Sequence, residues 1–379
     1  MASADDLAHD SYIGATGDGA AGPSSAPRNS PHPVRRIYAP LARLGAVLPG
    51  PAAAARQALG EVLAPLGSAP ASDSPWSGSD LTPDGFPVAF AWSSRDEAIR
   101  WVAEIAGADV APAARIEAAC GMLERLTGQP VPADSPSVPM SGRSGLRFGA
   151  RIGGWHSGRE DRFRLYVESS YAEGEERHCL EGLECRLSRL VAWQMRGFQP
   201  GRIDCDHYGR LGRLTLSEAR RIVEWANIPV ADTVGTLLSL LVQPGEGDPA
   251  TIEDAAIRVA LRRARPVEVT IYARSPASVS RTAAAMAQLD AAATLLGHDI
   301  RPLGALVGNR DQPLGHVGRV GVGASIAGAC WLHAGWTPEA TGAGRVEIPS
   351  CGDAPVDGGG IDPIPVQQED HPCPFPSFS

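Results

Sequence analysis

The chain has 379 residues, of which 43% are hydrophobic and 20% charged, and its formal net charge is -9. This composition predicts a globular protein with a substantial core, and the acidic balance argues against a nucleic-acid partner, because phosphate binding needs a basic surface. The longest apolar stretch, residues 234–242, is far shorter than the about 20 residues of a membrane-spanning helix, so no membrane partner is expected.

All 34 basic residues are arginines, because the sequence contains no lysine. This excludes a lysine Schiff base, as in pyridoxal phosphate enzymes, and a complete P-loop. A bound phosphate or carboxylate would have to be held by arginine, whose planar fork suits oxyanions. A genome biased toward arginine codons explains the absence equally well, but the chemical exclusion holds in either case.

The seven cysteines are scattered along the chain, which predicts reduced thiols rather than a disulfide framework. The first residues show no signal-peptide pattern, so a cytoplasmic location is expected. Cys179, Cys185, Cys205 and His207 match no common zinc spacing. The sequence therefore predicts no metal site and no cofactor, and leaves a magnesium requirement open.

The two ends of the chain lack apolar periodicity. Residues 1–33 combine Gly, Ala, Ser, Pro and Asp, and residues 350–379 run through three glycines into repeated prolines. Both compositions are typical of disordered segments. We therefore expect one folded domain over residues 34–349, with disordered tails on both sides.

Between the tails, helical and strand-like patterns recur in order. Helical spacing of apolar residues predicts helices at about 40–48, 53–66, 95–107, 112–127, 175–196, 217–227, 231–243, 252–263 and 276–298. Alternation predicts strands at about 85–93, 146–153, 161–169, 199–204, 211–216, 266–274, 318–326 and 328–336. Ser94 and Glu97 fit a capping box that would open the helix near 95–107.

The order of these elements is helices followed by strand pairs, several times over. Strands joined by short connections pair antiparallel, whereas single strands alternating with helices form parallel sheets. An α+β fold is therefore expected, and a Rossmann fold is disfavoured. The glycines at 318–328 lead into a strand-like segment and do not fit a dinucleotide loop.

Two predicted strands separate apolar from polar side chains. In residues 161–168, one face carries Phe163, Leu165 and Val167, and the other carries Arg162, Arg164, Tyr166 and Glu168. Residues 267–274 repeat the pattern, with Glu268, Thr270, Tyr272 and Arg274 on the polar face. A sheet with one face in water gives this alternation, and so does a closed barrel whose polar faces point inward.

Two short motifs carry a resemblance to a known family. The segment Leu-Thr-Pro-Asp-Gly-Phe-Pro-Val-Ala-Phe-Ala-Trp at 81–92 looks like the early strand of the indole-type aromatic prenyltransferases, which tends to read T-x-D-x-x-P-V-E-F-S-W. Arg164-Leu165-Tyr166 is similar to their K-x-Y strand. The helix and strand order resembles their ABBA architecture, an antiparallel β-barrel of repeated αα-strand-strand units with helices outside.

The resemblance implies transfer of an allylic group from a prenyl diphosphate to an aromatic or peptide acceptor. By position, Arg100 and Arg164 would bind the diphosphate, and Arg213, on another polar strand face, could join them. The implied aromatic shield around the allylic cation contains Tyr166 and Tyr272. Because the chain has few tyrosines, the shield would also need a tryptophan, with Trp92, Trp331 and Trp336 as candidates. Aromatic faces attract cations and exclude water, and arginines accept the charge of the departing diphosphate.

The chain also departs from the family pattern. Ala89 stands where the family has an acidic residue, and Glu268 and Thr270 stand where it has basic ones. Glu168 is the candidate replacement base, and the alternative is that it pairs with a neighbouring arginine. His156 could reach a barrel mouth or lie on the surface. A catalytically degenerate barrel with a binding or scaffold role, and an unrelated α+β enzyme, remain alternatives.

Overall fold

The computed structural model describes residues 33–67, 79, 81–82, 86–107, 110–131, 146–169, 174–202, 204–242, 251–274, 279–309, 312–313 and 315–338. All of them belong to the first of the two compact units into which the chain divides, residues 1–342. Apart from Pro33, the predicted disordered tails lie outside these ranges. No helix in this part of the chain is long and apolar enough to cross a membrane.

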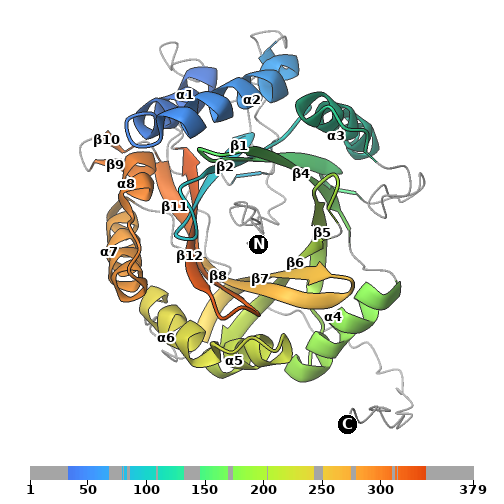
Figure 1. Cartoon of the computed structure of the whole chain (residues 1–379), viewed down its shortest axis with the longest axis vertical. Helices are drawn as coiled ribbons and strands as arrows, with labels where there is room; N and C mark the ends of the chain where they lie inside the picture. Colours follow the sequence, from blue (N-terminus) through green and yellow to red (C-terminus); the bar gives the residue numbers. More distant parts are fainter. Residues whose placement is uncertain are drawn as a thin grey trace, which may run out of the picture. The chain divides into compact units, whose positions relative to one another are not determined.

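Ten antiparallel strands close into one barrel in the order β1-β12-β11-β8-β7-β6-β5-β4-β3-β2 (Figure 1). The ring closes where Phe90 of the first strand pairs with Trp336 of the last. The barrel strands are β1 (Val88–Ser93), β2 (Ile99–Ala103), β3 (Ala150–His156), β4 (Asp161–Glu168), β5 (Ala192–Phe198), β6 (Asp204–Thr215), β7 (Thr251–Arg262), β8 (Arg265–Arg274), β11 (Gly315–Ser325) and β12 (Cys330–Pro338). Two short strands, β9 (Gly308–Asn309) and β10 (Gln312–Pro313), pair separately. The predicted antiparallel barrel is confirmed.

The helices form a ring around the outside of this barrel (Figure 1). They are α1 (Pro33–Leu44), α2 (Pro49–Gly67), α3 (Pro112–Thr127), α4 (Gly174–Leu187), α5 (Leu216–Trp225), α6 (Ala231–Leu241), α7 (Val279–Leu296) and α8 (Arg301–Val307). One or two helices precede each strand pair. The helix α3 agrees with its predicted range, because Pro112 suits a helix start and Gly128 closes the helix at φ 66°.

The main hydrophobic core lies between the helices and the outer face of the barrel. Phe163, Leu165 and Val167 of β4 belong to it, as do Ile257 and Val259 of β7. Burying one large aliphatic or aromatic side chain contributes about 1.5–3 kcal/mol. Because side chains alternate along a strand, this outer apolar face forces the intervening residues into the barrel interior.

The helix expected near 95–107 is absent, because this segment is a turn followed by β2. Ile99, Trp101 and Ala103 join the outer core, while Arg100 lies on the other face. The outward side chains of this segment therefore repeat every two residues, as in a strand. The Ser94 hydroxyl accepts the backbone N–H of Leu332 at 2.9 Å and does not cap a helix.

The helix expected near 252–263 is also wrong, because these residues form β7. Ile257, Val259 and Leu261 face the core, and Arg258 faces inward between them. Similarly, the helix expected to reach residue 196 ends at Leu187, where Ser188 takes a left-handed φ of 54°, and β5 follows. The apolar residues of such short segments fit both a helical and a strand period, and only pairing with neighbouring strands distinguishes them.

Candidate functional site

The interior of the barrel carries arginines that are almost completely buried. Arg100, Arg151 and Arg258 have a relative exposure of 0%, and Arg164 has 4%. They lie on β2, β3, β7 and β4, each on the strand face opposite the outer core. Buried guanidinium groups are costly unless they are paired, so their partners decide what the interior can bind.

Two of the inward arginines, Arg164 and Arg258, share two carboxylates with Arg95 in an alternating chain of charges. Asp206 of β6 pairs with Arg164 and with Arg258, whose Nη2 lies 3.1 Å from Oδ1. Glu268 of β8 pairs with Arg258 at 3.2 Å and with Arg95, from the turn before β2, at 2.8 Å. We call these five residues the interior ion network.

Two further pairs lie beside this network. Arg151 Nη2 is 3.5 Å from Glu104 Oε1, and Arg100 Nη2 is 2.6 Å from Asp96 Oδ2. The Nε and Nη1 atoms of Arg100 are buried and have no hydrogen-bond partner among the residues that the structure describes. Arg100 therefore keeps buried donors available for an additional anion.

Aromatic rings lie among these charges. The rings of Tyr166 and Tyr208 meet edge to face at 5.8 Å, and Tyr272 meets His333 at 5.3 Å. The guanidinium of Arg95 lies 4.5 Å from the centre of the Trp331 ring. Burial, together with the nearby Tyr166, raises the pKa of Tyr208 well above its usual value despite the opposing charges of the arginines, so this phenol stays protonated.

Glycines allow three of these rings to lie against the barrel wall. A Cβ atom added to Gly197 would come within 2.8 Å of the Tyr166 ring. The corresponding distances are 2.5 Å from Gly321 to Tyr272 and 2.1 Å from Gly323 to Trp331. In each pair the glycine stands directly opposite the aromatic residue on the neighbouring strand, so only a residue without a side chain leaves room for the ring.

One part of the interior is apolar. Ala89, Val102, Phe148 and Met195 form a buried cluster that also includes Tyr166 and Tyr208 and lies apart from the outer core. This interior apolar cluster borders the Glu104–Arg151 pair, because Arg151 lies 3.8 Å over the Phe148 ring. The interior thus combines cationic groups with an apolar surface, which suits an anionic ligand with a hydrocarbon part.

The structure brings together five of the residues expected at the site. Arg100, Arg164, Tyr166, Tyr272 and Trp331 all lie on inward strand faces and are buried. Their placement follows from alternation along β2, β4, β8 and β12. The partner of Arg100 is Asp96, four residues earlier. The partners of Arg164, Tyr166 and Tyr272 come from other strands, and the sequence did not provide them.

Two expected site residues lie elsewhere. Trp92 packs in the outer core with Val88 and Phe90, because β1 turns its large apolar residues toward the helices. The side chain of Arg213 is 63% exposed and pairs with Glu253, which is 73% exposed. Neither residue can therefore contact a ligand in the interior, and both expectations are corrected.

Glu168 and His156 are used by the local structure. The Glu168 carboxylate accepts the backbone N–H groups of Arg147, Phe148 and Gly149 at 2.8 to 3.0 Å. His156 is buried on the outer side of the barrel, where its ring stacks against Trp101 at 5.9 Å. It lies neither at a barrel mouth nor on the surface, and Glu168 holds a loop instead of pairing with an arginine.

Several interior residues were not predicted from the sequence, namely Arg95, Glu104, Asp206, Tyr208 and Arg258. The alternation of Asp204, Asp206 and Tyr208 was a usable signal for an inward polar face. The inward position of Arg258 could not be recognised because its segment was predicted to be a helix. The same holds for Arg95 and Glu104, which lie in the helix expected near 95–107.

No family model and no curated protein matches the sequence, but solved structures do match the fold. The 5-dimethylallyltryptophan synthase from Streptomyces coelicolor, in complex with DMASPP and Trp, superposes with a TM-score of 0.65 at 17% identity, over 85% of this chain and 100% of that one. A 6-dimethylallyltryptophan synthase from Micromonospora olivasterospora gives 0.63 at 18% identity, over 81% and 98%.

The prenyltransferase-like neighbours also include AnaPT from Neosartorya fischeri, with a TM-score of 0.56 at 13% identity, over 81% of this chain and 93% of that one. All these matches span nearly the whole neighbour, so the complete barrel is shared. The low identity explains why no sequence comparison matches. The chain therefore has the ABBA barrel fold of the aromatic prenyltransferases, in a strongly diverged sequence.

Proposed function

We propose that this protein transfers an allylic group from a prenyl diphosphate to an aromatic acceptor, free or within a peptide, inside the barrel. The observation that carries the proposal is the joint burial of arginines and aromatic rings on the inward faces of an ABBA barrel. Neighbours with the same fold bind DMASPP and tryptophan. The closed wall of strands would keep water from the reactive intermediate.

The diphosphate would be bound first by Arg100. Its Nε and Nη1 atoms are buried donors without a partner in the described part of the chain, and charge-assisted hydrogen bonds to phosphate are strong. Arg164 and Arg258 would contribute positive charge but already share Asp206. The interior ion network and the two neighbouring pairs contain five arginines and four carboxylates, so a diphosphate must compete with internal anions.

In the reaction, the bond between the allylic carbon and the diphosphate oxygen breaks, and the electron pair leaves with the diphosphate. The arginines stabilise that growing charge. The rings of Tyr166, Tyr208, Tyr272 and Trp331 would surround the allylic cation through their π faces. An electron pair of the acceptor ring then forms the new carbon–carbon bond, and the acceptor loses a proton to a base.

We assign the base to Glu104, which the sequence analysis did not select. Ala89 cannot accept a proton, but it pairs with Val102 of β2, and Glu104 lies two residues further on the same inward face. Its contact with Arg151 is long, at 3.5 Å, and it borders the interior apolar cluster. Glu168 suits this role less well because three backbone N–H groups hold its carboxylate.

A cytoplasmic location is part of the proposal. The five cysteines within the described residues are all free thiols, which agrees with a reducing compartment.

The test is to incubate the full chain with dimethylallyl diphosphate and a panel of tryptophan, indoles, phenols and tryptophan-containing peptides, and to detect prenylated product by mass spectrometry. R100Q should lower kcat/KM by about 100-fold, the usual loss on removing a donor that stabilises transition-state charge. R213Q is the matched control, because it removes an exposed arginine. E104Q should lower turnover while diphosphate affinity is kept.

The absence of both product and calorimetric binding of dimethylallyl diphosphate would contradict the proposal. Binding without product for any acceptor would instead support the catalytically degenerate barrel.

A further inference from the structure

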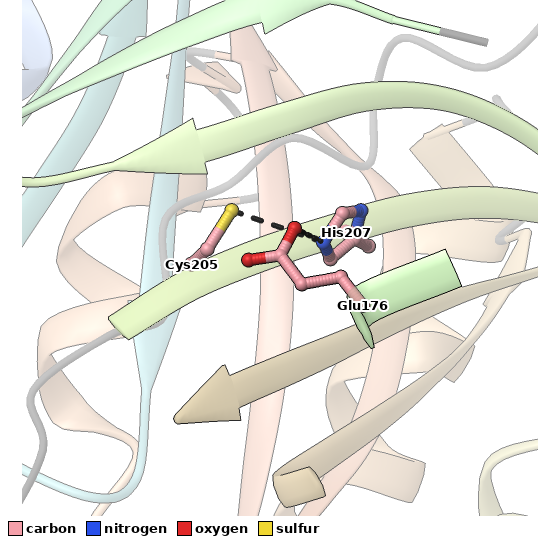
Figure 2. A group of neighbouring side chains, drawn as sticks. All are labelled: Glu176, Cys205 and His207. Carbon is pink, nitrogen blue, oxygen red and sulfur yellow. Dashed lines mark hydrogen bonds and ion pairs between the residues drawn. The ribbon is translucent and has the colours of Figure 1, made fainter. Parts of the chain in front are cut away.

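A cluster of three metal-ligand residues lies outside the barrel, where α4 packs against the outer wall. Cys205 and His207 are two residues apart on β6, so their side chains share the outward face, whereas Asp206 between them points into the interior. Glu176 comes from the first turn of α4. Figure 2 shows the sulfur, a ring nitrogen and the carboxylate pointing toward one another.

The geometry of this cluster is not that of a proton relay. His207 Nε2 lies 3.8 Å from Cys205 Sγ and 3.2 Å from Glu176 Oε2. A relay would use the two ring nitrogens for the two partners, but here the same nitrogen faces both. The N–H of this nitrogen can point at either the sulfur or the carboxylate oxygen, but not at both. A hydrogen bond from His207 therefore leaves one of these two atoms without a partner in the cluster.

The same distances fit tetrahedral coordination. Zinc lies about 2.3 Å from sulfur, about 2.0 Å from imidazole nitrogen and about 2.0–2.2 Å from carboxylate oxygen. At a tetrahedral angle these lengths place sulfur about 3.5 Å from nitrogen, and nitrogen about 3.4 Å from oxygen. All three donor atoms lie within 4.8 Å of one another, so an ion would fit with little movement.

We propose that Glu176, Cys205 and His207 bind one zinc-like divalent metal ion, with water as the fourth ligand. A thiolate, an imidazole and a carboxylate together favour this borderline-soft ion over magnesium, which prefers oxygen ligands alone. The Glu176 side chain is 24% exposed, which leaves a path for the ion and for the water.

The residues around the cluster fit a bound ion. The thiolate and the carboxylate would neutralise its two charges, and Arg196 Nη2 donates to Glu176 Oε2 at 2.5 Å. A carboxylate oxygen has two lone pairs and can accept this bond while it binds metal. The Trp193 ring meets the His207 ring edge to face at 6.1 Å and orients it. The ion would fasten α4 to β6, independently of the reaction in the interior.

The test uses the untagged full chain after treatment with a chelator, titrated with Co²⁺ and with Zn²⁺. Wild-type protein should bind one equivalent of Co²⁺ with a thiolate-to-cobalt charge-transfer band, which C205S should lack. Each of C205S, H207Q and E176Q should weaken binding by about tenfold or more, as changes at metal sites do. C185S, the same substitution at an exposed cysteine of α4, should bind like the wild type.

A second measurement needs no variant. Zn²⁺ should protect Cys205 of the wild-type chain from alkylation, read by peptide mass spectrometry, and leave Cys185 reactive. The proposal would be overturned if the wild-type chain showed no thiolate–cobalt band. It would also be overturned if Zn²⁺ left the alkylation of Cys205 unchanged.

Discussion

His156 is held in one protonation state by its two neighbours. Trp101 Nε1 donates to His156 Nε2 at 2.9 Å, so this nitrogen must carry no proton, and Nδ1 lies 2.9 Å from Asp161. Burial lowers the pKa of His156, although Asp161 acts in the opposite direction. Protonation of Nε2 would place two N–H groups against each other and break the contact with Trp101.

This arrangement makes stability depend on pH. Because the folded state binds the His156 proton less readily than the unfolded chain, the contribution is complete above the unfolded pKa of about 6.5 and is lost as the pH falls from there toward the lowered folded pKa. Urea unfolding at about pH 7.5 and about pH 5.5 should show a larger acid loss for wild type than for H156Q. H178Q, a change at an exposed histidine, should lose as much stability between the two pH values as the wild type. An equal acid loss in H156Q would contradict the prediction.

Gly321 makes room for the Tyr272 ring. An added Cβ would lie 2.5 Å from Tyr272 Cδ1 and 3.0 Å from the carbonyl oxygen of Ile271, and the backbone atom cannot turn away. G321A should therefore lower the free energy of unfolding by about 1–3 kcal/mol, as overpacking does. G304A in α8, where a Cβ meets nothing within 4 Å, should be neutral or slightly stabilising. Equal stability of the two variants by denaturant unfolding would contradict this.

The end of β4 is tied to the segment before β3 by the Glu168 side chain and by one backbone hydrogen bond, from the Glu168 N–H to the carbonyl oxygen of Gly149 at 2.8 Å. The Glu168 carboxylate accepts three backbone N–H groups at 147–149, which otherwise lack a regular partner strand. E168Q should lower the free energy of unfolding by about 1–3 kcal/mol, because an amide oxygen replaces two charged acceptors. Chemical denaturation of E168Q and of the wild type measures this difference in the free energy of unfolding. Loss of turnover without loss of stability would instead restore Glu168 as the catalytic base.

Alternation within a strand could be predicted where apolar and polar residues differ sharply. In β4 and β8 each inward and outward residue follows from a period of two, because alternation is a local property of extended backbone. The same rule failed for β2 and β7, where apolar residues three and four positions apart, such as Ile99, Val102 and Ala103, also fit one face of a helix. Their large outward residues became informative only once neighbouring strands had paired with them.

The interior ion network joins strands that are far apart in the sequence. Asp206 is shared by Arg164 and Arg258, the latter 52 residues away. D206N would leave two buried guanidinium groups short of negative charge, which typically costs about 3–5 kcal/mol. Thermal unfolding should show this loss, and inorganic diphosphate should stabilise D206N more than wild type, because the ligand supplies the missing charge.

The control for this experiment is D232N. Asp232 is 93% exposed and pairs with Arg220, and such exposed ion pairs contribute only about 0–1 kcal/mol to stability. A D206N protein that diphosphate stabilises no more than wild type would place the anion site away from the network.

The amino-acid pattern alone was enough for the antiparallel class, the outer apolar faces and the inward position of Arg164, Tyr166 and Tyr272, because each depends on residues close together in the chain. It could not supply the partners of those side chains. Asp206 meets Arg258 because β6 pairs with β7, although the two residues are 52 positions apart. Arg95, from the turn between β1 and β2, meets Glu268 of β8 because the barrel closes between β1 and β12. Ring closure is a long-range event, so the charges that face one another across the interior are set by the fold and leave no mark in local spacing.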